Sequence, residues 1–247
     1  MKILDLTFPS PAENLAGDEA LLDWCEAGAG EEVLRFWESR EHFVVVGYAN
    51  KARAEVNLAA CETKGIPLYR RCSGGGTVLQ GPGCLNYTLV LKITDDGPLH
   101  SITSTNRFIM ERNRAVIESL YPKSGMRDPK SEIAVRGHTD LCLGDLKFSG
   151  NSQRRRKQFL LFHGTFLLNF DLALVSEVLA TPPKQPEYRE NRAHAEFLTN
   201  LNVRAETVKA VLQKAWNADL PVKSPPLDKA AILARDKYAT IAWNQRF

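Results

Sequence analysis

The chain has 247 residues, of which 44% are hydrophobic, and its formal net charge is +3. This apolar content suffices for one large core, or for a main domain with a small appendage, and it excludes a disordered or fibrous protein. A charge so close to neutrality excludes the field of a non-specific nucleic-acid coat, so any basic site is local.

Targeting and redox signals are missing from the sequence. No apolar run approaches the roughly 18–20 residues that a bilayer span needs. Asp5, Glu13 and Asp18 interrupt the N-terminal segment where a signal peptide keeps its apolar region. Five scattered cysteines without a CxxC pair argue against a disulfide framework and a structural zinc site. We expect a cytoplasmic protein with reduced thiols and no membrane or nucleic-acid partner, in which one thiol can still be a nucleophile.

The first half of the chain mixes helical and extended patterns. Apolar residues at helical spacing predict helices, and short β-branched runs closed by glycine predict strands. The predicted elements are a helix over 11–27, a strand over 42–48, an extended segment over 67–71, a strand over 85–93 and a helix over 104–120 that Pro122 ends.

The second half begins with short apolar runs joined by glycine and polar residues, which predict strands across 132–170. A composition break at 181–185 precedes two amphipathic helices at 207–216 and 227–238. Because the elements do not alternate as βαβα, a doubly wound nucleotide-binding fold is disfavoured. We predict one α+β domain with a mixed, largely antiparallel sheet and flanking helices. Its parts are a catalytic body over 1–184 and a small helical extension over 185–247.

The strongest local feature is the run RRCSGGGT over 70–77. Consecutive glycines let the backbone approach a ligand, and successive N–H groups in such a loop can bind an anion. The two arginines add charge that can hold a phosphate or a carboxylate. The loop is neither a Walker P-loop nor a GxGxxG motif, and a plain flexible turn is an equal alternative.

A second feature is the run GDLKFSGNSQ over 144–153, followed by His163 and Gly164. Lys147 and Ser149 are in phase on the predicted strand and therefore share a face. A lysine there can stabilise negative charge on an acyl oxygen or an α-phosphate. The alternatives are a solvent-facing lysine on an edge strand and, for His163, a hydrogen-bonded core residue.

Taken together, these segments resemble the lipoate-protein ligase family. The runs RRCSGGGTV, GCLN, TDL, GDLKFSGNSQRR and HGTFLL follow one another in the order and spacing of that family, across residues 14–171. The family belongs to the biotin/lipoate ligase superfamily, which is related to the catalytic core of class II aminoacyl-tRNA synthetases, so the resemblance implies that fold. Biotin ligation fits less well, because the loop lacks the later arginine of the GRGRxxR pattern of biotin enzymes.

The resemblance implies a two-step reaction. Lipoate, and octanoate as a second acid, would react with ATP and Mg²⁺ to give an acyl adenylate, and a lysine of a lipoyl carrier protein or lipoyl domain would then take the acyl group. Lys147 corresponds to the catalytic lysine of the family, and Asp140 would bind magnesium or orient the adenylate. The residues that would line the lipoate and adenylate pocket are Arg70, Arg71, Ser73, Gly74, Gly75, Gly76, Thr77, Val78, Asn86, Asp140, Gly150, Ser152, His163 and Gly164.

Two other functions remain open. Related octanoyl and lipoyl transferases carry the acyl group on a cysteine, which falls near the position of Asp140 in the transferases most similar to the ligases. The aspartate favours the ligase. However, Cys142 is in phase with it along the strand, so a transferase that uses Cys142 as its nucleophile stays open. The third candidate is a non-catalytic module that binds lipoate or a nucleotide, against which the presence of Lys147 argues.

Three segments lie outside these motifs. The run KYATIAWN over 237–244 resembles the point where many family members continue into an accessory domain, so we expect that domain to be lacking or to be supplied as a separate polypeptide. The basic run over 154–157 would either steer an acidic lipoyl domain or form a solvated hairpin tip. The block over 181–201 would cover the adenylate, meet the acceptor or only pack onto the core, and its candidate residues are Tyr188, Arg189, Arg192 and His194.

Overall fold

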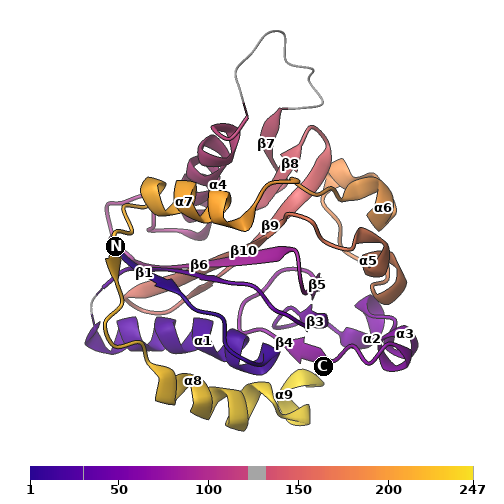
Figure 1. Cartoon of the computed structure of the whole chain (residues 1–247), viewed down its shortest axis with the longest axis horizontal. Helices are drawn as coiled ribbons and strands as arrows, with labels where there is room; N and C mark the ends of the chain where they lie inside the picture. Colours follow the sequence, from indigo (N-terminus) through magenta and orange to yellow (C-terminus); the bar gives the residue numbers. More distant parts are fainter. Residues whose placement is uncertain (30, 122–131, 247) are drawn as a thin grey trace.

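The structure, a computed structural model, describes residues 1–29, 31–121 and 132–246, so the predicted helix end at Pro122 lies outside the described residues. Its strands form two sheets (Figure 1). In chain order they are β1 (Lys2–Asp5), β2 (Val33–Trp37), β3 (Phe43–Val46), β4 (Leu68–Arg70), β5 (Val78–Gln80), β6 (Cys84–Lys92), β7 (Ile133–Arg136), β8 (Asp140–Leu143), β9 (Leu146–Arg155), β10 (Phe159–Leu167) and β11 (Leu220–Pro221).

The larger sheet has the strand order β11-β1-β2-β6-β10-β9-β8-β7, and the smaller has the order β4-β3-β5. Across the large sheet, each neighbouring pair in the order β2-β6-β10-β9-β8-β7 is antiparallel. Strand β1 pairs parallel with both β2 and β11. The predicted α+β class with a mixed, largely antiparallel sheet is therefore confirmed.

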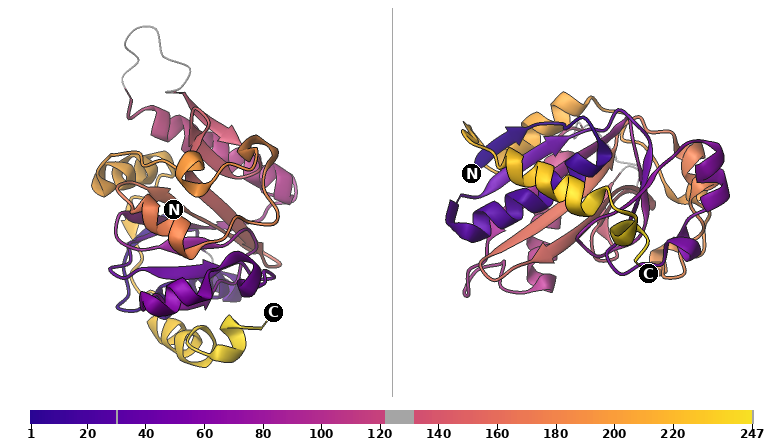
Figure 2. Two further views of the ribbon diagram at one scale, coloured as in Figure 1. Left: turned by 90° about the vertical axis from the view of Figure 1, so that its right-hand side faces the viewer. Right: turned by 90° about the horizontal axis from the view of Figure 1, so that it is seen from below.

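Helices cover both faces of the large sheet. They are α1 (Pro11–Trp24), α2 (Ala52–Glu55), α3 (Leu58–Thr63), α4 (Ile102–Glu118), α5 (Leu172–Val178), α6 (His194–Phe197), α7 (Ala205–Ala215), α8 (Leu227–Leu233) and α9 (Ile241–Asn244). Helices α4 and α7 lie on one face, and α1, with α8 against it, lies on the other (Figures 1 and 2).

The alternation of side chains along β10 explains this layering. Successive residues of a strand point to opposite faces. Phe162 and Phe166 join the core beneath α4 and α7, whereas Phe159 and Leu161 join the core beneath α1. Each such side chain is worth about 1.5–3 kcal/mol when fully buried, so β10 stabilises both layers at once.

The predicted helix over 11–27 is confirmed as α1, which continues into a π-helical turn at Cys25–Ala29. It begins at a capping box, in which the Ser10 hydroxyl accepts from the Glu13 N–H and the Glu13 carboxylate accepts from the Ser10 N–H. These reciprocal bonds satisfy donors that the first helical turn leaves free, which sets the start of α1.

The other predicted elements are found with small shifts at their ends. The strands predicted over 42–48 and 85–93 are β3 and β6, and the extended segment over 67–71 ends in β4. The predicted strands across 132–170 are β7 to β10, and the later predicted helices correspond to α4, α7 and α8. The predicted elements lack the strands β1, β2, β5 and β11 and the short helices α2, α3, α5, α6 and α9. Arg35 interrupts the apolar run of β2, yet it is fully buried because Asp18 of α1 pairs with it at 2.6 Å.

Residues after 185 pack into the same cores as the rest of the chain. Val208, Leu212 and Trp216, from α7 and its end, belong to the largest core, and β11 extends the large sheet next to β1. At the other end of this segment, Asn244 of α9 accepts a hydrogen bond from the backbone N–H of Arg70 at 2.9 Å. The C-terminal segment thus reaches the base of the glycine loop.

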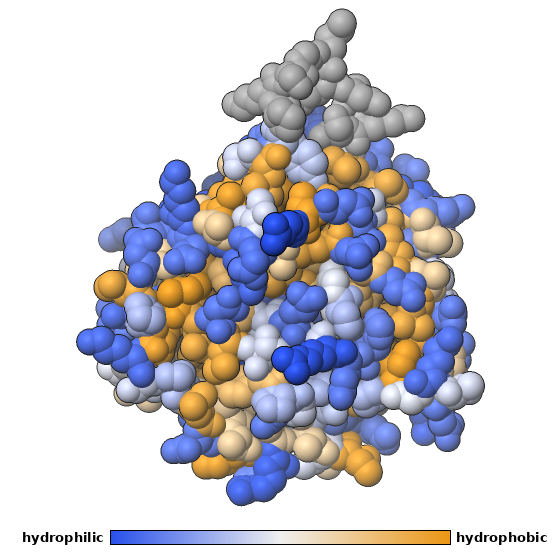
Figure 3. Space-filling view, in the orientation of Figure 1, coloured by the Kyte–Doolittle hydropathy of each residue, from blue (hydrophilic) through white to orange (hydrophobic). Residues whose placement is uncertain are grey.

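The surface carries no single dominant apolar region on the face shown in Figure 3, where hydrophilic side chains are spread between smaller apolar groups. Within the ranges that the structure describes, no helix is both long enough and apolar enough to cross a bilayer. The large apolar side chains that are exposed come from six elements, and only α8 contributes two of them: Leu58, Ile102, Leu146, Leu220, Leu227, Ile232 and Ile241.

Candidate active site

A cavity of about 470 Å³ lies between the two sheets and the segment that follows α5. The predicted site residues that line it are Arg71, Gly75, Gly76, Thr77, Val78, Asn86, Asp140, Lys147, Gly150, Ser152, His163 and Gly164. Arg70, Ser73 and Gly74 are not part of the lining. The tertiary fold therefore brings together residues that are up to 93 positions apart, from Arg71 to Gly164, at one cavity.

The strand register explains why these residues meet. Asp140 pairs with Gly150, Gly150 with Thr165, and Thr165 with Asn86, so the four form one row across β8, β9, β10 and β6. Residues directly opposite each other in a sheet lie on the same face. A register shift between Leu141 and Cys142 adds a bulge at the same place. Such irregularities re-aim side chains and are frequent beside active sites.

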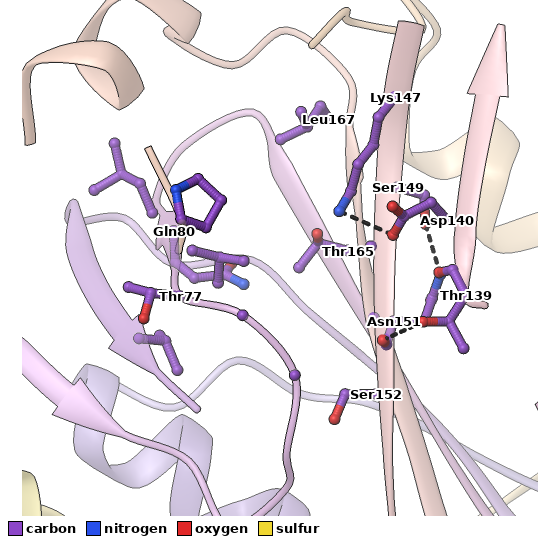
Figure 4. Close-up of a pocket in the computed structure, with 18 of the residues that line it drawn as sticks. Thr77, Gln80, Thr139, Asp140, Lys147, Ser149, Asn151, Ser152, Thr165 and Leu167 are labelled. Atoms are coloured by element: carbon purple, nitrogen blue, oxygen red, sulfur yellow. Dashed lines mark hydrogen bonds and ion pairs between the residues drawn. The ribbon is translucent and has the colours of Figure 1, made fainter. Parts of the chain in front are cut away.

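Lys147 projects into the cavity and pairs with Asp140. Its ammonium nitrogen lies 2.9 Å from Asp140 Oδ1, and the two side chains are 24% and 14% exposed (Figure 4). A Cβ on Gly150 would lie 2.8 Å from Lys147 Nζ, so Gly150 makes room for the lysine. Figure 4 shows Lys147 on the opposite side of the cavity from Thr77 and Gln80. The predicted common face of Lys147 and Ser149 is confirmed, because both line the cavity.

Tyr188 connects the 181–201 block to this ion pair. Its hydroxyl donates to Asp140 Oδ2 at 2.7 Å, so both carboxylate oxygens of Asp140 have protein partners. Burial and the neighbouring carboxylate of Asp140 raise the pKa of Tyr188, which therefore stays a donor. The contact of Tyr188 with Asp140 follows only from the fold, because the two residues lie 48 positions apart in the chain.

Arg71 organises the glycine loop from inside. Its guanidinium donates to the carbonyl oxygens of Gly74 at 2.6 Å and Gly76 at 2.7 Å, and burial lowers its pKa to about 10. The Ser152 hydroxyl also donates to the Gly74 carbonyl, at 2.8 Å. Within the described chain, the N–H groups of Gly74, Gly75 and Gly76 donate to no protein acceptor. The loop thus presents amides, rather than carbonyls, for an anionic ligand.

Glu55 is a lining residue that the sequence analysis does not identify. Its carboxylate accepts from the Thr77 hydroxyl at 2.5 Å, from the Thr77 N–H at 3.2 Å and from the Asn50 amide at 2.8 Å. The Asn50 amide also donates to the Gly75 carbonyl at 3.1 Å. Glu55 therefore holds the end of the glycine loop, a role that its place on the short helix α2 does not reveal.

Arg70 has a structural position instead of the predicted place in the pocket. Its side chain is fully buried and donates to the carbonyl oxygens of Gly47 at 2.8 Å, Asn50 at 2.8 Å and Asn244 at 3.1 Å. The two arginines of the motif therefore point to different sides, because adjacent residues of an extended segment project in opposite directions. Arg70 connects the glycine loop to α9, whereas Arg71 forms hydrogen bonds within the loop.

Ser73, His163 and Asp18 form a chain of hydrogen bonds beside the cavity. His163 Nε2 lies 2.6 Å from the Ser73 hydroxyl, and His163 Nδ1 lies 3.0 Å from Asp18 Oδ2. Burial alone would raise the pKa of Asp18, but Arg35 and His163 hold it below its usual value. Ser73 is only 1% exposed and does not line the cavity. These three residues therefore resemble a Ser-His-Asp relay in their order, but their hydrogen bonds anchor the glycine loop to β10 and α1.

Asn151 explains the glycine at 164. A Cβ on Gly164 would lie 1.7 Å from Asn151 Oδ1, so the space belongs to the asparagine side chain. Asn151 accepts from the Tyr87 hydroxyl at 2.6 Å and donates to the Thr139 carbonyl at 2.8 Å. Asn113 of α4 donates to that hydroxyl at 2.9 Å. This buried network ties the cavity wall to the helical layer above it.

The profile of the lipoyl protein ligase A/B catalytic domain matches residues 10–217. The chain belongs to this family. The matched range holds the glycine loop, Lys147 and all of β6 to β10, so the lining described above lies within the family's catalytic domain.

Two relatives are named for different activities, one as an octanoyltransferase and the other as a lipoate-protein ligase subunit. Octanoyltransferase LipM of Geobacillus kaustophilus is 26% identical over 270 residues, which cover 98% of this chain and 97% of that protein. Lipoate-protein ligase A subunit 1 of Thermoplasma acidophilum is 30% identical over 247 residues, which cover 94% of this chain and 90% of that protein. Family membership alone therefore leaves the choice between ligase and transferase to the site.

Solved structures of family members share the whole fold. The T. acidophilum protein solved with bound lipoic acid matches with a TM-score of 0.77 at 26% identity, over 99% of this chain and 98% of that chain. A bi-partite lipoate protein ligase from T. acidophilum, studied with its E2 lipoyl domain, matches with a TM-score of 0.77 at 27% identity, over 99% and 95%. A lipoate-protein ligase A bound with ATP matches with a TM-score of 0.74 at 30% identity, over 99% and 98%.

None of the cysteines of this lipoyl ligase family member lines the cavity. Each of the five is buried, none is a lining residue, and burial raises the pKa of every thiol. Cys142, the candidate nucleophile, is fully buried, its sulfur lies 3.6 Å from the Tyr188 hydroxyl, and its pKa is raised to about 11. Since a thiolate is the nucleophilic form, these cysteines lack both access and ionisation.

Among the described residues, no three His, Cys, Asp or Glu side chains are grouped so that they could hold a metal ion. The predicted ligand Asp140 uses one oxygen for Lys147 and the other for Tyr188. In this structure Asp140 therefore orients Lys147, and its predicted role as a magnesium ligand stays a prediction.

Proposed function

We propose that this chain is an ATP-dependent lipoate-protein ligase. It activates lipoate, and octanoate as a second acid, to the acyl adenylate, and it transfers the acyl group to a lysine of a lipoyl domain or lipoyl carrier protein. The observation that carries this proposal is a cavity that contains Lys147 and the glycine-loop amides but no thiol.

The first step calls for positive charge and amide donors in one place. A carboxylate oxygen of lipoate attacks the α-phosphorus of ATP, the new P–O bond forms, and the bond to pyrophosphate breaks. Negative charge is then shared by the α-phosphate oxygens and the acyl oxygen. Lys147, held by Asp140, and the amides of Gly75 and Gly76 supply preorganised donors for that charge.

The second step needs an acyl adenylate that is protected from water. The amine of the acceptor lysine attacks the acyl carbon, AMP leaves with the bonding electrons, and the attacking nitrogen loses a proton. Apolar lining residues offer a dry wall for the alkyl tail: Val78, Leu79, Leu167, Phe170, Val175 and Leu179. Such a wall accepts an octanoyl chain as readily as a lipoyl chain, because it recognises apolar surface alone.

A thiol-dependent transferase is the second candidate, favoured by the identity with LipM. That reaction needs a cysteine sulfur next to the acyl carbon, and the burial of all five thiols argues against it. A non-catalytic binding module would not require the ion pair that orients Lys147 towards the cavity.

The deciding experiment measures pyrophosphate release by the purified chain with ATP and magnesium ions in the buffer, with and without lipoate. We expect release that depends on lipoate, together with lipoylation of an added lipoyl domain. Octanoyl transfer from octanoyl carrier protein without ATP, in the absence of lipoate-dependent pyrophosphate, would replace the ligase by a transferase. In the same assays Cys142→Ala should retain nearly full activity, whereas an inactive variant that folds would identify Cys142 as the nucleophile.

A further inference from the structure

A hydrogen-bond path connects the end of α7 with the wall of the cavity, through Trp216, Asn113, Tyr87, Asn151 and Thr139. Trp216 Nε1 donates to Asn113 Oδ1 at 2.9 Å, and Asn113 Nδ2 donates to the Tyr87 hydroxyl at 2.9 Å. The Tyr87 hydroxyl donates to Asn151 Oδ1 at 2.6 Å, and Asn151 Nδ2 donates to the Thr139 carbonyl at 2.8 Å. The last three residues line the cavity, whereas Trp216 and Asn113 belong to the helical layer behind it.

The two ends of the hydrogen-bond path fix the direction of every bond in it. An indole N–H can only donate, so the Asn113 amide turns its oxygen to Trp216 and its NH₂ group to Tyr87. The Thr139 carbonyl can only accept, so Asn151 turns its NH₂ group there and its oxygen to Tyr87. Burial raises the pKa of Tyr87, so its hydroxyl keeps the proton that it donates. Loss of this hydroxyl therefore disconnects the two amides.

The cavity end of the hydrogen-bond path holds the residue that precedes Asp140. Thr139 is the last residue of the turn between β7 and β8, and its hydroxyl donates to the Asn151 carbonyl at 2.7 Å. Thr139 and Asn151 thus exchange two hydrogen bonds, one in each direction. Asp140 begins β8, and its carboxylate lies 2.9 Å from the Lys147 ammonium (Figure 4). A displacement of Thr139 therefore moves the carboxylate that orients Lys147.

We propose that Tyr87 and Asn151 are positioning residues for Lys147. They hold the turn before Asp140, and through the hydrogen-bond path they make adenylation depend on the packing of α4 and α7. The proposal rests on the proposed function, because it takes adenylation as the step that Lys147 serves. The ammonium of a lysine is carried by a flexible four-carbon side chain, so it needs support from groups that are themselves fixed. The hydrogen-bond path supplies that support.

The test is a double-mutant cycle of Tyr87→Phe and Lys147→Ala. The phenylalanine keeps the aromatic ring and removes only the hydroxyl that connects the two amides. Single-turnover pyrophosphate release with saturating lipoate and ATP measures the adenylation rate of the four proteins. Tyr121→Phe is the matched control, because it removes a hydroxyl that donates to the Leu201 carbonyl at 3.3 Å and does not line the cavity. Thermal unfolding checks that each variant is folded.

We expect Tyr87→Phe to lower the adenylation rate about tenfold in the wild-type background and less than about twofold in the Lys147→Ala background, because residues of one network do not act additively. The Kd values of lipoate and ATP should stay within about twofold, as for an interaction that matters only in the transition state. Trp216→Phe breaks the far end of the hydrogen-bond path, should act in the same direction, and replaces Tyr87→Phe in the cycle if that variant does not fold.

Three results would overturn the proposal: an unchanged adenylation rate in folded Tyr87→Phe, an equal loss in the wild-type and Lys147→Ala backgrounds, or an equal loss in Tyr121→Phe. An equal loss in both backgrounds would mean that the Tyr87 hydroxyl acts on the fold or on the substrate and not through Lys147.

A second readout separates this proposal from the ligase function. Reductive methylation with formaldehyde, followed by peptide mass spectrometry, measures the reactivity of the Lys147 amine without substrates. Its rate should rise at least about twofold in Tyr87→Phe and stay constant in Tyr121→Phe, as expected when an ion pair coupled to the hydroxyl loosens. Raised reactivity in Tyr87→Phe, without lipoyl-AMP formation by the wild type, refutes only the ligase. Lipoyl-AMP formation by the wild type, with unchanged rate and reactivity in Tyr87→Phe, refutes only the positioning role.

Discussion

At the scale of single residues, the glycines of the motifs make room for neighbouring side chains as well as for a ligand. Gly150 admits the ammonium of Lys147, and Gly164 admits the amide of Asn151. Both contacts come from other positions of the same sheet, so the sequence pattern identifies the glycines but not the reason for them. Lys147 itself is oriented by Asp140, whose second oxygen is held by Tyr188.

The role of Lys147 leads to a mutational prediction. We expect Lys147→Ala to lower the rate of adenylation about 10²- to 10³-fold, as for the loss of one preorganised donor to developing negative charge. The fold should be retained, because Asp140 keeps the hydrogen bond from the Tyr188 hydroxyl after the ammonium is removed. The measurement is lipoate-dependent pyrophosphate release, with Lys157→Ala, at an exposed lysine next to the end of β9, as the control. Full activity of Lys147→Ala would remove this lysine from the mechanism.

At the scale of elements, adjacent arginines and a basic run turn out to connect segments. Arg70 joins β4 to α9, while Arg71 stays within the glycine loop. In the run over 154–157, Arg154 donates to the Cys72 carbonyl at 2.8 Å and Arg156 pairs with Asp23 at 2.9 Å. Arg154 and Arg156 thus bind within the molecule, whereas Lys157 at the end of the run is exposed.

We therefore expect Arg70 to contribute to the stability of the fold and not to ligand binding. Arg70→Gln leaves several buried carbonyl oxygens without donors, and each unsatisfied group costs about 1–3 kcal/mol, so we expect the free energy of unfolding to fall by about 3 kcal/mol or more. Urea denaturation measures this change, and Arg53→Gln, at an exposed arginine of α2, is the control. An unchanged free energy of unfolding combined with lost adenylation would return Arg70 to the ligand pocket.

At the scale of the whole molecule, the C-terminal segment supports the active site from two directions. Trp216 donates to Asn113, which reaches Asn151 at the cavity through the Tyr87 hydroxyl. On the far side, Asn244 and its neighbours hold Arg70 beneath the glycine loop. The relative from T. acidophilum is named as a first subunit, and its ligase is described as bi-partite. For this chain, a second polypeptide that assists the first reaction step is a hypothesis.

This partnership predicts different rates for the two steps of the isolated chain. If a second polypeptide assists adenylation, the chain alone should transfer the acyl group from supplied lipoyl-AMP at least about tenfold faster than it lipoylates the same domain from lipoate and ATP, because closure over two substrates limits the first step. Single-turnover measurements with a lipoyl domain give both rates. Equal rates in the two assays would mean that the chain needs no helper for adenylation.

The sequence by itself determined the α+β class, most strands, the helices α1, α4, α7 and α8, and the two motifs that carry the glycine loop and Lys147, because periodicity and glycine runs are local properties. Only the tertiary structure showed which of the two arginines, Arg70 or Arg71, faces the cavity, since that depends on what packs on each side of the extended segment. Burial of Arg35 beside Asp18 likewise needed a partner from another element. The inaccessibility of Cys142 and the hydrogen bond from Tyr87 to Asn151 are also tertiary facts, because the access, the pKa and the partners of a side chain are set by neighbours distant in the chain.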